Sequence, residues 1–405
     1  MLYFFVVVAL CVLGGASASN NGTEEARRLQ TKSKESGYGL RAAEPQRKRA
    51  AAKYERLKKL LATIDVKAPS WLEPESWGKT DFAKTGPTIF AAAMDNTYGP
   101  LEAEMFLGTA RKGGFAGEFF VAVLSGANPE FIEKLKEYKA VVFKVDTSCE
   151  GKVHDKRCSF VGAGDNAAKY SINMIRWHLY QWWGSMLDEK AEIMVADFRD
   201  VFFQGNPFAY RRYEWAHPVS QLTVFQEAYP NKVIYRCPFN GGWIGGCYGE
   251  EGLKRIGNNP VSCSGVTLGL RDAVIAYSHL MTQQLDPRVR YGRETTQTNK
   301  QCISLGMDQG FHNWLVYSGQ LDKYMDVKIF SQGEGPVNTV GAFFPGPRAL
   351  LKFDLKTWNI LKGEGKNKAF HNWNGDRSPV VHQADRFLNS DLKGGYQANL
   401  DVAQP

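Results

Sequence analysis

The 405-residue sequence predicts an α/β fold with a doubly wound, mostly parallel sheet, flanking helices and a mixed β/α portion toward the C-terminus. Between residues 88 and 196, short apolar runs that fit buried parallel strands alternate with longer helical segments. After residue 208 this rhythm gives way to short β-like runs separated by Gly and Cys. At this length the chain can bury a complete core.

The first half of the expected fold alternates strictly between strand and helix. The segments, in chain order, are strand Thr88–Met94, helix Pro100–Arg111, strand Glu118–Leu124, helix Pro129–Tyr138, strand Ala140–Val145, the aromatic-rich helix Asn166–Leu187 and strand Ala191–Ala196. The second half is expected to contain β-like runs at Gln221–Phe225, Lys232–Tyr235 and Gly241–Ile244, a small-residue strand at Cys263–Gly269, and helices at Leu270–Leu285 and Met307–Tyr317.

The N-terminus predicts entry into the secretory pathway. An apolar run, Leu2–Leu13, precedes Gly14-Gly15 and the small residues Ala16-Ser17-Ala18, the pattern of a cleavable signal peptide over residues 1–18. No Lys or Arg precedes the run, and the segment is just long enough to span a bilayer, so a retained signal-anchor is the alternative. The expected location is the Golgi lumen or outside the cell, with membrane contact only through such an anchor.

The positive charge of the chain is concentrated near its N-terminus. The stretch from Ser19 to Leu60 holds 12 Lys/Arg and 5 Asp/Glu and so accounts for seven of the eight net positive charges. A nearly neutral body excludes a nucleic-acid-binding core. We expect a disordered basic tail at 19–50, an amphipathic helix and linker at 51–80, one globular domain at 81–390 and a C-terminal tail at 391–405.

Cysteine content agrees with an oxidising compartment. Six cysteines remain beyond Cys11 of the leader, enough for up to three disulfides, and buried free thiols are the alternative. Cys149 and Cys158 flank a short charged loop and are the favoured local pair. A zinc site is not expected, because the sequence contains no C-x-x-C pair. Asn21 begins the N-x-S/T sequon of the basic tail, where a glycan would be sterically tolerated.

Open α/β sheets bind ligands where their strands end, and the first such end is Met94–Gly99. This segment matches neither the G-x-G-x-x-G fingerprint nor the P-loop, which argues against NAD chemistry and ATP hydrolysis. Asp95 or Asn96 could accept hydrogen bonds from a nucleoside. A capped turn before the next helix is the equally simple interpretation.

The second informative strand end is Asp197-Phe198-Arg199-Asp200. Two carboxylates at the end of an apolar strand could hold a hard divalent cation, which would bridge a diphosphate and stabilise a leaving nucleoside diphosphate. Arg199 could pair with a carboxylate or face phosphate. An ion pair that caps a helix is the alternative explanation of the two acids.

Three later segments could complete this site. Gly265 lies in a small-residue strand, where a sugar could approach the backbone closely. Asp308 and Gln309 open a helix, where they could grip sugar hydroxyls or stabilise a positive centre, and a plain helix cap is the alternative for Asp308. His382 follows a short apolar run, and its imidazole suits Mn²⁺ as a third protein ligand, although a structural role is common for a lone histidine.

Taken together, these motifs resemble those of GT-A nucleotide-diphospho-sugar transferases. ADFRDVFFQGNPF is similar to the metal-binding carboxylate motif, NGGWIGG and SGVTLG to the Gly-rich strands on the acceptor side, GMDQGFHNWLVY to the Asp-Gln helix and VVHQADR to the C-terminal metal-binding histidine. The order of the motifs agrees as well, and the resemblance extends from Thr88 to Arg386. One departure concerns spacing: the family uses D-x-D, whereas Asp197 here stands one residue too early.

The resemblance implies a Mn²⁺- or Mg²⁺-dependent glycosyltransferase with a nucleotide-sugar donor and a glycan, protein or lipid acceptor. It places the metal on Asp200 and His382 with Asp197 assisting, and Asp308 and Gln309 at the sugar. A non-catalytic carbohydrate- or nucleotide-binding protein that retains the fold is the main alternative, because an aromatic content of 13% suits sugar stacking equally well. A secreted metal-dependent phosphodiesterase would need more clustered ligands than seven histidines provide.

Overall fold

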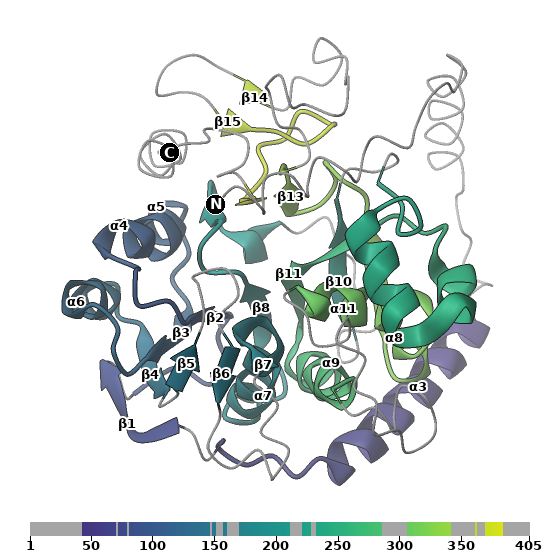
Figure 1. Ribbon diagram of the computed structural model, residues 1–405, viewed down its shortest axis with the longest axis horizontal. Coiled ribbons are helices and arrows are strands. Elements are labelled where there is room, and N and C mark those ends of the chain that lie inside the picture. The colour runs from purple at the N-terminus through teal and green to yellow at the C-terminus, as the bar shows by residue number, and fades with distance from the viewer. Residues whose placement is uncertain are drawn as a thin grey trace.

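The computed structural model describes residues 43–69, 72–78, 81–145, 148–150, 157–159, 170–210, 221–227, 232–285, 306–341, 361–362 and 369–383 (Figure 1). Its helices are α3 (Ala43–Thr63), α4 (Pro100–Ala103), η2 (Glu104–Gly108), α5 (Thr109–Lys112), α6 (Pro129–Glu137), α7 (Ile172–Ser185), η3 (Pro207–Ala209), α8 (Pro238–Ile256), α9 (Arg271–Gln283), α11 (Met307–Tyr317) and η6 (Leu321–Lys323).

The strands are β1 (Leu72–Gly78), β2 (Thr88–Ala93), β3 (Glu118–Leu124), β4 (Val141–Val145), β5 (Ser148–Glu150), β6 (Arg157–Ser159), β7 (Tyr170–Ser171), β8 (Glu192–Ala196), β9 (Val201–Phe203), β10 (Gln221–Gln226), β11 (Ser262–Leu270), β12 (Asp326–Phe330), β13 (Val337–Thr339), β14 (Leu361–Lys362), β15 (Ala369–Phe370) and β16 (Val380–His382).

A central sheet of eight strands has the order β1-β4-β3-β2-β8-β11-β10-β12. The strands β4, β3, β2 and β8 are mutually parallel, and β10 and β12 run the same way. Only β1 and β11 oppose them within this sheet. The mixed α/β class with a mostly parallel sheet is therefore confirmed.

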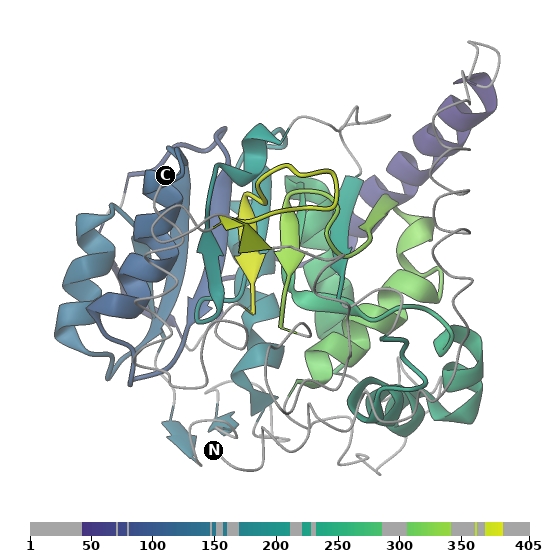
Figure 2. The ribbon, with the colours of Figure 1, turned by 90° about the horizontal axis from the view of Figure 1, so that it is seen from above.

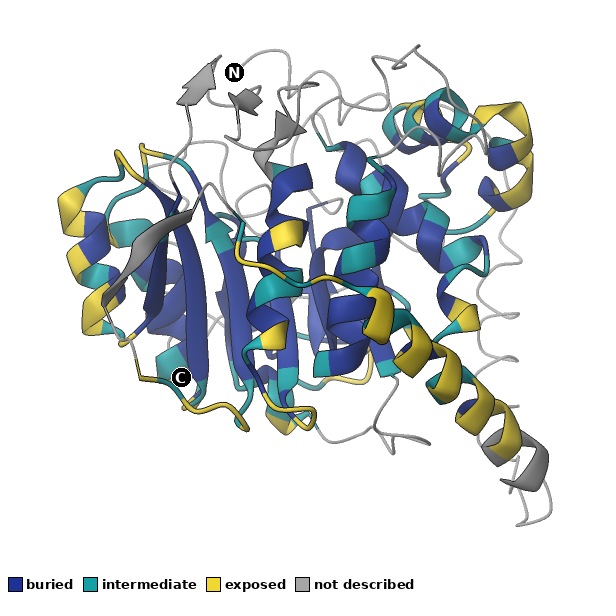
Figure 3. Ribbon diagram, turned by 90° about the horizontal axis from the view of Figure 1, so that it is seen from below, coloured by how far each residue is buried: buried dark blue, intermediate teal, exposed yellow. Residues whose placement is uncertain are grey.

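Alternating side chains of the central strands build one core on each face of the sheet. Phe90 and Phe120 pack with Trp177 and Trp183 of α7, and the same cluster includes residues of α9 and α11. The neighbouring residues Ile89 and Phe119 of these strands point to the other face, where η2 and α6 contribute apolar side chains. Figure 3 shows the buried strands covered by helices. This two-sided burial explains why the strands read as continuous apolar runs rather than alternating ones.

A small sheet, β13-β16-β9, lies beyond the end of β8, a central strand of the main sheet, and includes β16 near the end of the described chain (Figure 2). β16 pairs parallel with β13 and antiparallel with β9. Since only four residues separate the end of β8 from the start of β9, this sheet attaches the C-terminal segment to the end of a central strand. The small sheet is thus the element that brings distant residues to the edge of the main one.

The N-terminal helix is longer than predicted. α3 begins at Ala43 rather than Ala51, so residues 43–50 are helical and not part of a disordered tail. Leu57 packs into the core and Lys53 pairs with Asp326, which fixes the C-terminal half of α3, whereas the other half extends from the body (Figure 3). Residues 1–42 and 384–405, with the predicted leader and tails, lie outside the described residues. Among the described helices, none combines the length and the apolar character that crossing a membrane requires.

The Gly-rich segment Gly241–Ile244 was predicted as a strand, and that prediction is wrong. It lies within α8, which starts with Pro238 at its first turn, a favourable position for proline. Gly241 lies so close to the carbonyl oxygen of Ile234 that a Cβ there would meet it at 3.1 Å. Close packing against a neighbouring segment therefore outweighs the weak helix propensity of glycine. The Lys232–Tyr235 run forms only a single bridge, Val233 to Pro260, and then a turn.

His312 of α11 is fully buried and contacts polar groups through both ring nitrogens. Its Nε2 lies 2.8 Å from Ser262 Oγ and its Nδ1 lies 2.5 Å from Tyr277 Oη. Burial, with a smaller contribution from the Arg176 guanidinium, lowers the pKa of His312 to about 3. The imidazole therefore stays neutral in the folded protein at any pH near neutrality.

We expect this histidine to destabilise the fold in acid. Below a pH of about 6.5 the unfolded chain binds a proton at His312 that the folded chain does not bind, so stability is lost as pH falls toward 3. His312→Gln keeps a hydrogen-bonding side chain without that titration, and the decrease in unfolding free energy between pH 7 and pH 4 should become shallower. Urea denaturation measures it, with His371→Gln as a surface control; identical pH dependence in wild type and His312→Gln would contradict the expectation.

A candidate metal centre at the sheet edge

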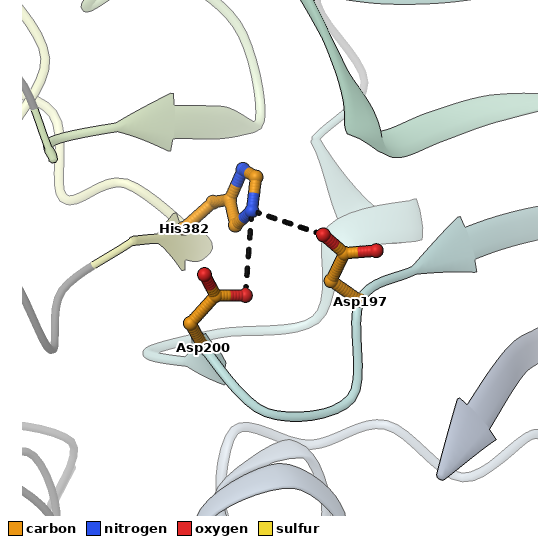
Figure 4. Close-up of side chains that lie close together, drawn as sticks. All are labelled: Asp197, Asp200 and His382. Atoms are coloured by element: carbon orange, nitrogen blue, oxygen red, sulfur yellow. Dashed lines mark ion pairs between the residues drawn. The ribbon is translucent and has the colours of Figure 1, made fainter. Parts of the chain in front are cut away.

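Asp197, Asp200 and His382 meet where β8 leaves the central sheet (Figure 4). One ligand atom from each of the three lies within 4.8 Å of the others, so the group could hold a metal ion. His382 Nε2 is 3.5 Å from Asp200 Oδ1 and 3.7 Å from Asp197 Oδ2. The structure thus joins three residues that the sequence separates by up to 185 positions.

Asp197 is held at its place by the neighbouring strand. Its backbone N–H donates to the carbonyl oxygen of Gly265 at 2.7 Å, which continues the β8–β11 pairing by one residue. Gly265 is required here, because a Cβ at this position would meet His382 Cε1 at 2.3 Å and Asp197 Oδ2 at 2.7 Å. The atoms that approach Gly265 closely thus belong to the candidate metal site, and the predicted approach of a sugar to this strand stays a prediction.

Asp200 and His382 are brought together by the small sheet. Asp200 directly precedes β9, His382 is the last residue of β16, and Val201 pairs with His382 in the ladder. The Gln383 N–H also donates to the Asp200 carbonyl oxygen at 2.8 Å. Between the two acids, Phe198 packs against Phe106 and Tyr98 in the core. This buried ring anchors the turn, and the turn lets a D-x-x-D spacing present both carboxylates to one imidazole.

A buried arginine connects Asp197 to Asp308. Arg176 of α7 is only 6% exposed; its Nη1 donates to Asp197 Oδ1 and its Nη2 lies 2.7 Å from Asp308 Oδ2. Ser264 Oγ donates to the same Asp308 oxygen at 3.1 Å. Asp308 lies in the first turn of α11, but Gly306 occupies the N-cap position, and Asp308 Oδ2 accepts from the side chains of Arg176 and Ser264 rather than from the helix backbone.

Gln309 faces a different polar group from its neighbour Asp308. Its Nε2 donates to Glu227 Oε1 at 3.0 Å and to Asn240 Oδ1 at 3.3 Å. Glu227 directly follows β10, is buried, and also accepts from Lys232 Nζ at 2.8 Å. Because β10 runs parallel to β8, Glu227 and Asp197 lie at the ends of strands that point the same way.

Burial and neighbouring charges shift the pKa values of Asp197, Asp308 and His382 in different directions. Burial raises the pKa of Asp197, but Arg176 and then His382 outweigh it and lower the pKa overall. For Asp308, burial dominates over the attraction of Arg176 and the pKa is raised. Burial lowers the pKa of His382, yet Cys263, Asp200 and Asp197 together raise it well above the ordinary value. A cation that binds His382 must therefore displace a proton.

The donor set fits a hard or intermediate divalent ion. Two carboxylates and one imidazole are typical ligands for Mn²⁺, and carboxylates also suit Mg²⁺. His382 Nε2 is buried and has no hydrogen-bond partner in the structure, although it faces both acids. A metal ion bound to the lone pair of Nε2 would explain why this buried nitrogen makes no hydrogen bond. These observations fit Mn²⁺ or Mg²⁺ held by Asp197, Asp200 and His382.

The remaining predicted residues, Asp95, Asn96 and Arg199, are not members of the three-residue ligand cluster. Asp95 forms the capped turn that was the alternative interpretation: its Oδ1 accepts from the Thr97 N–H at 3.0 Å and from Thr97 Oγ1 at 2.8 Å. Asn96 is exposed beside it, at the end of β2, the strand next to β8. Arg199 Nη2 lies 3.7 Å from Asp200 Oδ2, so Arg199 borders the three-residue cluster.

The sequence interpretation missed Arg176, Glu227 and Asn240. Arg176 sits in an aromatic-rich helix, and its only signal in the sequence is a charged residue among the large apolar side chains of that helix. Glu227 had a usable signal, because it follows its strand directly, as Asp197 does. Asn240 was hidden by the incorrect assignment of its Gly-rich neighbourhood to a strand.

Cysteine positions only partly follow the prediction. Cys263 is a buried free thiol, so three disulfides among the six cysteines do not form. Cys149 and Cys158 stand opposite each other in the β5–β6 ladder, a backbone position that suits the favoured pair. Their side chains lie outside those described, and the disulfide stays a prediction.

Comparison with known proteins gives a distant likeness in fold. The chain is similar to the crystal structure of galactosyltransferase LgtC in complex with donor and acceptor sugar analogs, with 10% identity and a TM-score of 0.40. The similarity covers 78% of this chain and 95% of that chain. No protein-family model matches the chain, and no curated protein matches it.

Gly265→Ala should abolish Mn²⁺ binding while the protein stays folded. The added methyl group would overlap His382 and Asp197, and these side chains would have to separate. Gly205→Ala is the matched control, because its Cβ would meet Pro379 at an ordinary 3.7 Å. Titration calorimetry with Mn²⁺ should show binding for the control and none for Gly265→Ala. Equal Mn²⁺ affinity in the two variants would place the metal elsewhere.

Arg176→Met should destabilise the protein by about 3 kcal/mol, because removing one partner leaves Asp308 buried and uncompensated. This value is at the low end of the cost usually measured for removing one partner of a buried ion pair, since Asp197, the other partner of Arg176, is 30% exposed and partly solvated. Adding Asp308→Asn to Arg176→Met should recover part of the loss. Unfolding in urea measures all three proteins, and a double variant no more stable than Arg176→Met would contradict the proposed pairing.

Proposed function

We propose that this protein is a divalent-cation-dependent glycosyltransferase of the secretory pathway. It would move a sugar from a nucleotide-sugar donor to a glycan, protein or lipid acceptor. The observation that carries the proposal is the cluster of Asp197, Asp200 and His382 at the edge of the sheet where β8 ends. Such edges are where open α/β sheets bind ligands.

The cation would neutralise charge on the leaving diphosphate. In the donor, the bond between the anomeric carbon and a diphosphate oxygen breaks, and that oxygen keeps the electron pair. A nucleophilic atom of the acceptor, such as a hydroxyl oxygen, forms the new bond to the anomeric carbon and gives up its proton to the leaving diphosphate or to water. Mn²⁺ or Mg²⁺ on Asp197, Asp200 and His382 supplies positive charge for this oxygen when it is bound. Arg199 borders the cluster and is 29% exposed, so its guanidinium can reach toward phosphate from the solvent side.

Asp308 and Gln309 would hold the transferred sugar. Arg176 and Ser264 both bind Oδ2 of Asp308, which orients the carboxylate and leaves Oδ1 outside these two contacts. A carboxylate fixed in this way can accept from a sugar hydroxyl or stabilise positive charge at the anomeric carbon. Gln309 is oriented in turn by Glu227 and Asn240.

The nucleoside would lie over the end of β2. β2 is the parallel neighbour of β8, and Asp95 and Asn96 follow it directly. Asp95 orders a tight turn through Thr97, and this turn leaves Asn96 exposed. The absence of a Gly-rich phosphate loop at this position is consistent with a diphosphate that is bound through a cation instead.

The expected compartment follows from the chain's N-terminus. The apolar run Leu2–Leu13 with the small residues to Ala18 supports a signal peptide or a signal-anchor, and the sequon at Asn21 supports a glycoprotein. The opposed positions of Cys149 and Cys158 suit an oxidising lumen. We therefore propose the Golgi lumen or secretion as the location.

Asp200→Asn should remove Mn²⁺-dependent turnover of nucleotide sugars. The substitution conserves shape but removes a negative ligand charge, so we expect release of nucleoside diphosphate to fall at least about 100-fold. A panel of nucleotide sugars is incubated with purified protein and Mn²⁺, and nucleoside diphosphate is quantified. Asp322→Asn, an exposed residue that pairs with Lys53 far from the site, is the control.

Two results would count against the proposal. If wild type releases no nucleoside diphosphate from any donor yet binds nucleotide with Mn²⁺, the protein is a binding module that retains the fold. If Asp200→Asn turns over as fast as wild type, the reaction does not use this site.

A further inference from the structure

Cys263, the second residue of β11, lies between two parts of the site: the candidate metal cluster and the Gln309 side chain with its partners Glu227 and Asn240. It is a free thiol, only 3% exposed. Its Sγ lies 3.7 Å from His382 Nδ1 and 3.6 Å from Gln309 Oε1. Gln383 Nε2 also approaches Sγ at 3.7 Å. The thiol therefore contacts residues from both sides of the site.

A histidine that binds a metal through Nε2 needs a partner on Nδ1. That partner fixes the orientation of the ring and the position of its proton, and it is usually a carboxylate, a backbone carbonyl or water. Among the described residues, two side chains lie within hydrogen-bonding distance of His382 Nδ1: Thr339 Oγ1 at 3.4 Å and Cys263 Sγ at 3.7 Å.

The two contacts come from different sheets. Thr339 stands opposite His382 in the β13–β16 ladder of the small sheet. Cys263 belongs to the central sheet, where it pairs with Phe225. His382 is thus clamped between the two sheets, and Cys263 is the side-chain contact of Nδ1 from the sheet that also positions Asp197.

We propose that Cys263 is a positioning residue for the metal centre: with Thr339, it holds the His382 ring so that Nε2 faces Asp197 and Asp200. The proposal is carried by Nε2 of the same ring: His382 is 1% exposed, and Nε2 makes no hydrogen bond among the described residues but lies 3.5 Å from Asp200 Oδ1 and 3.7 Å from Asp197 Oδ2. This role rests on the cation site of the proposed function. It also explains a buried thiol in a chain expected to oxidise its cysteines, because a disulfide would withdraw Sγ from the imidazole.

The test uses the full chain and Mn²⁺ alone, so that no donor sugar has to be known. Cys263→Ala should weaken Mn²⁺ binding about 10- to 100-fold, the usual effect of removing a group that supports a ligand. Cys263→Ser should recover much of the affinity, and Thr339→Val should weaken it like Cys263→Ala. Val274→Ala, a buried truncation on α9, is the control for lost packing and should leave the Mn²⁺ affinity unchanged.

A double-variant comparison separates positioning from packing. In a His382→Ala background, Cys263→Ala should cause no further loss of Mn²⁺ affinity, because the thiol would act only through the imidazole. The same substitution should still lower the melting temperature in both backgrounds. An equal loss of affinity with and without His382 would overturn the proposal.

The remaining outcomes distinguish this role from the metal site itself. Unchanged Mn²⁺ affinity in Cys263→Ala, with wild type binding normally, overturns the role of Cys263 and leaves the metal site intact. If Cys263→Ala does not fold, unchanged affinity in both Cys263→Ser and Thr339→Val overturns it as well, since Thr339→Val removes the other Nδ1 partner. Wild type that does not bind Mn²⁺ overturns the metal site and this role together.

Discussion

Charge compensation between buried groups is the constraint on which the site depends. Asp197, Asp200 and Asp308 bring three carboxylates to one edge of the sheet, and the buried Arg176 guanidinium bridges two of them. A neutral His382 would leave two negative charges uncompensated among these groups, which matches the charge of a divalent cation. Two of these acids, Asp200 and Asp197, contribute to a pKa of His382 that is raised well above its ordinary value. The proposed metal site is thus a consequence of how the fold gathers acids.

The acids and the histidine are brought together where the central sheet meets the small sheet. Asp197 ends a strand of the central sheet, Asp200 begins a strand of the small sheet, and the buried ring of Phe198 anchors the turn between them. β16 then pairs with β9 and delivers His382 from near the C-terminus. Gly265 leaves the space in which the side chains meet. The turn between the two acids therefore lets a D-x-x-D spacing present both carboxylates to one imidazole.

Sequence alone predicted those parts of the fold whose signal is local. The predicted limits of the strand Glu118–Leu124 and of the helix Met307–Tyr317 agree with the structure. Burial of a strand on both faces gives a continuous apolar run, whereas burial of one helix face gives apolar residues at helical spacing. The Gly-rich α8 was assigned incorrectly, because tertiary packing rather than propensity makes it helical. The start of α3 was placed too late, since polar and charged residues of 43–50 show no amphipathic pattern. Among site residues, the carboxylates and the histidine could be identified by type and position, whereas Arg176 and Cys263 act through contacts that no local pattern encodes.

Anomalous X-ray diffraction at the manganese edge, from crystals of the full chain grown with Mn²⁺, tests the central claim most directly. The account predicts one strong peak bonded to His382 Nε2 and to carboxylate oxygens of Asp200 and Asp197, at the end of β8. A peak at any other place on the protein, or no peak at saturating Mn²⁺, would contradict it.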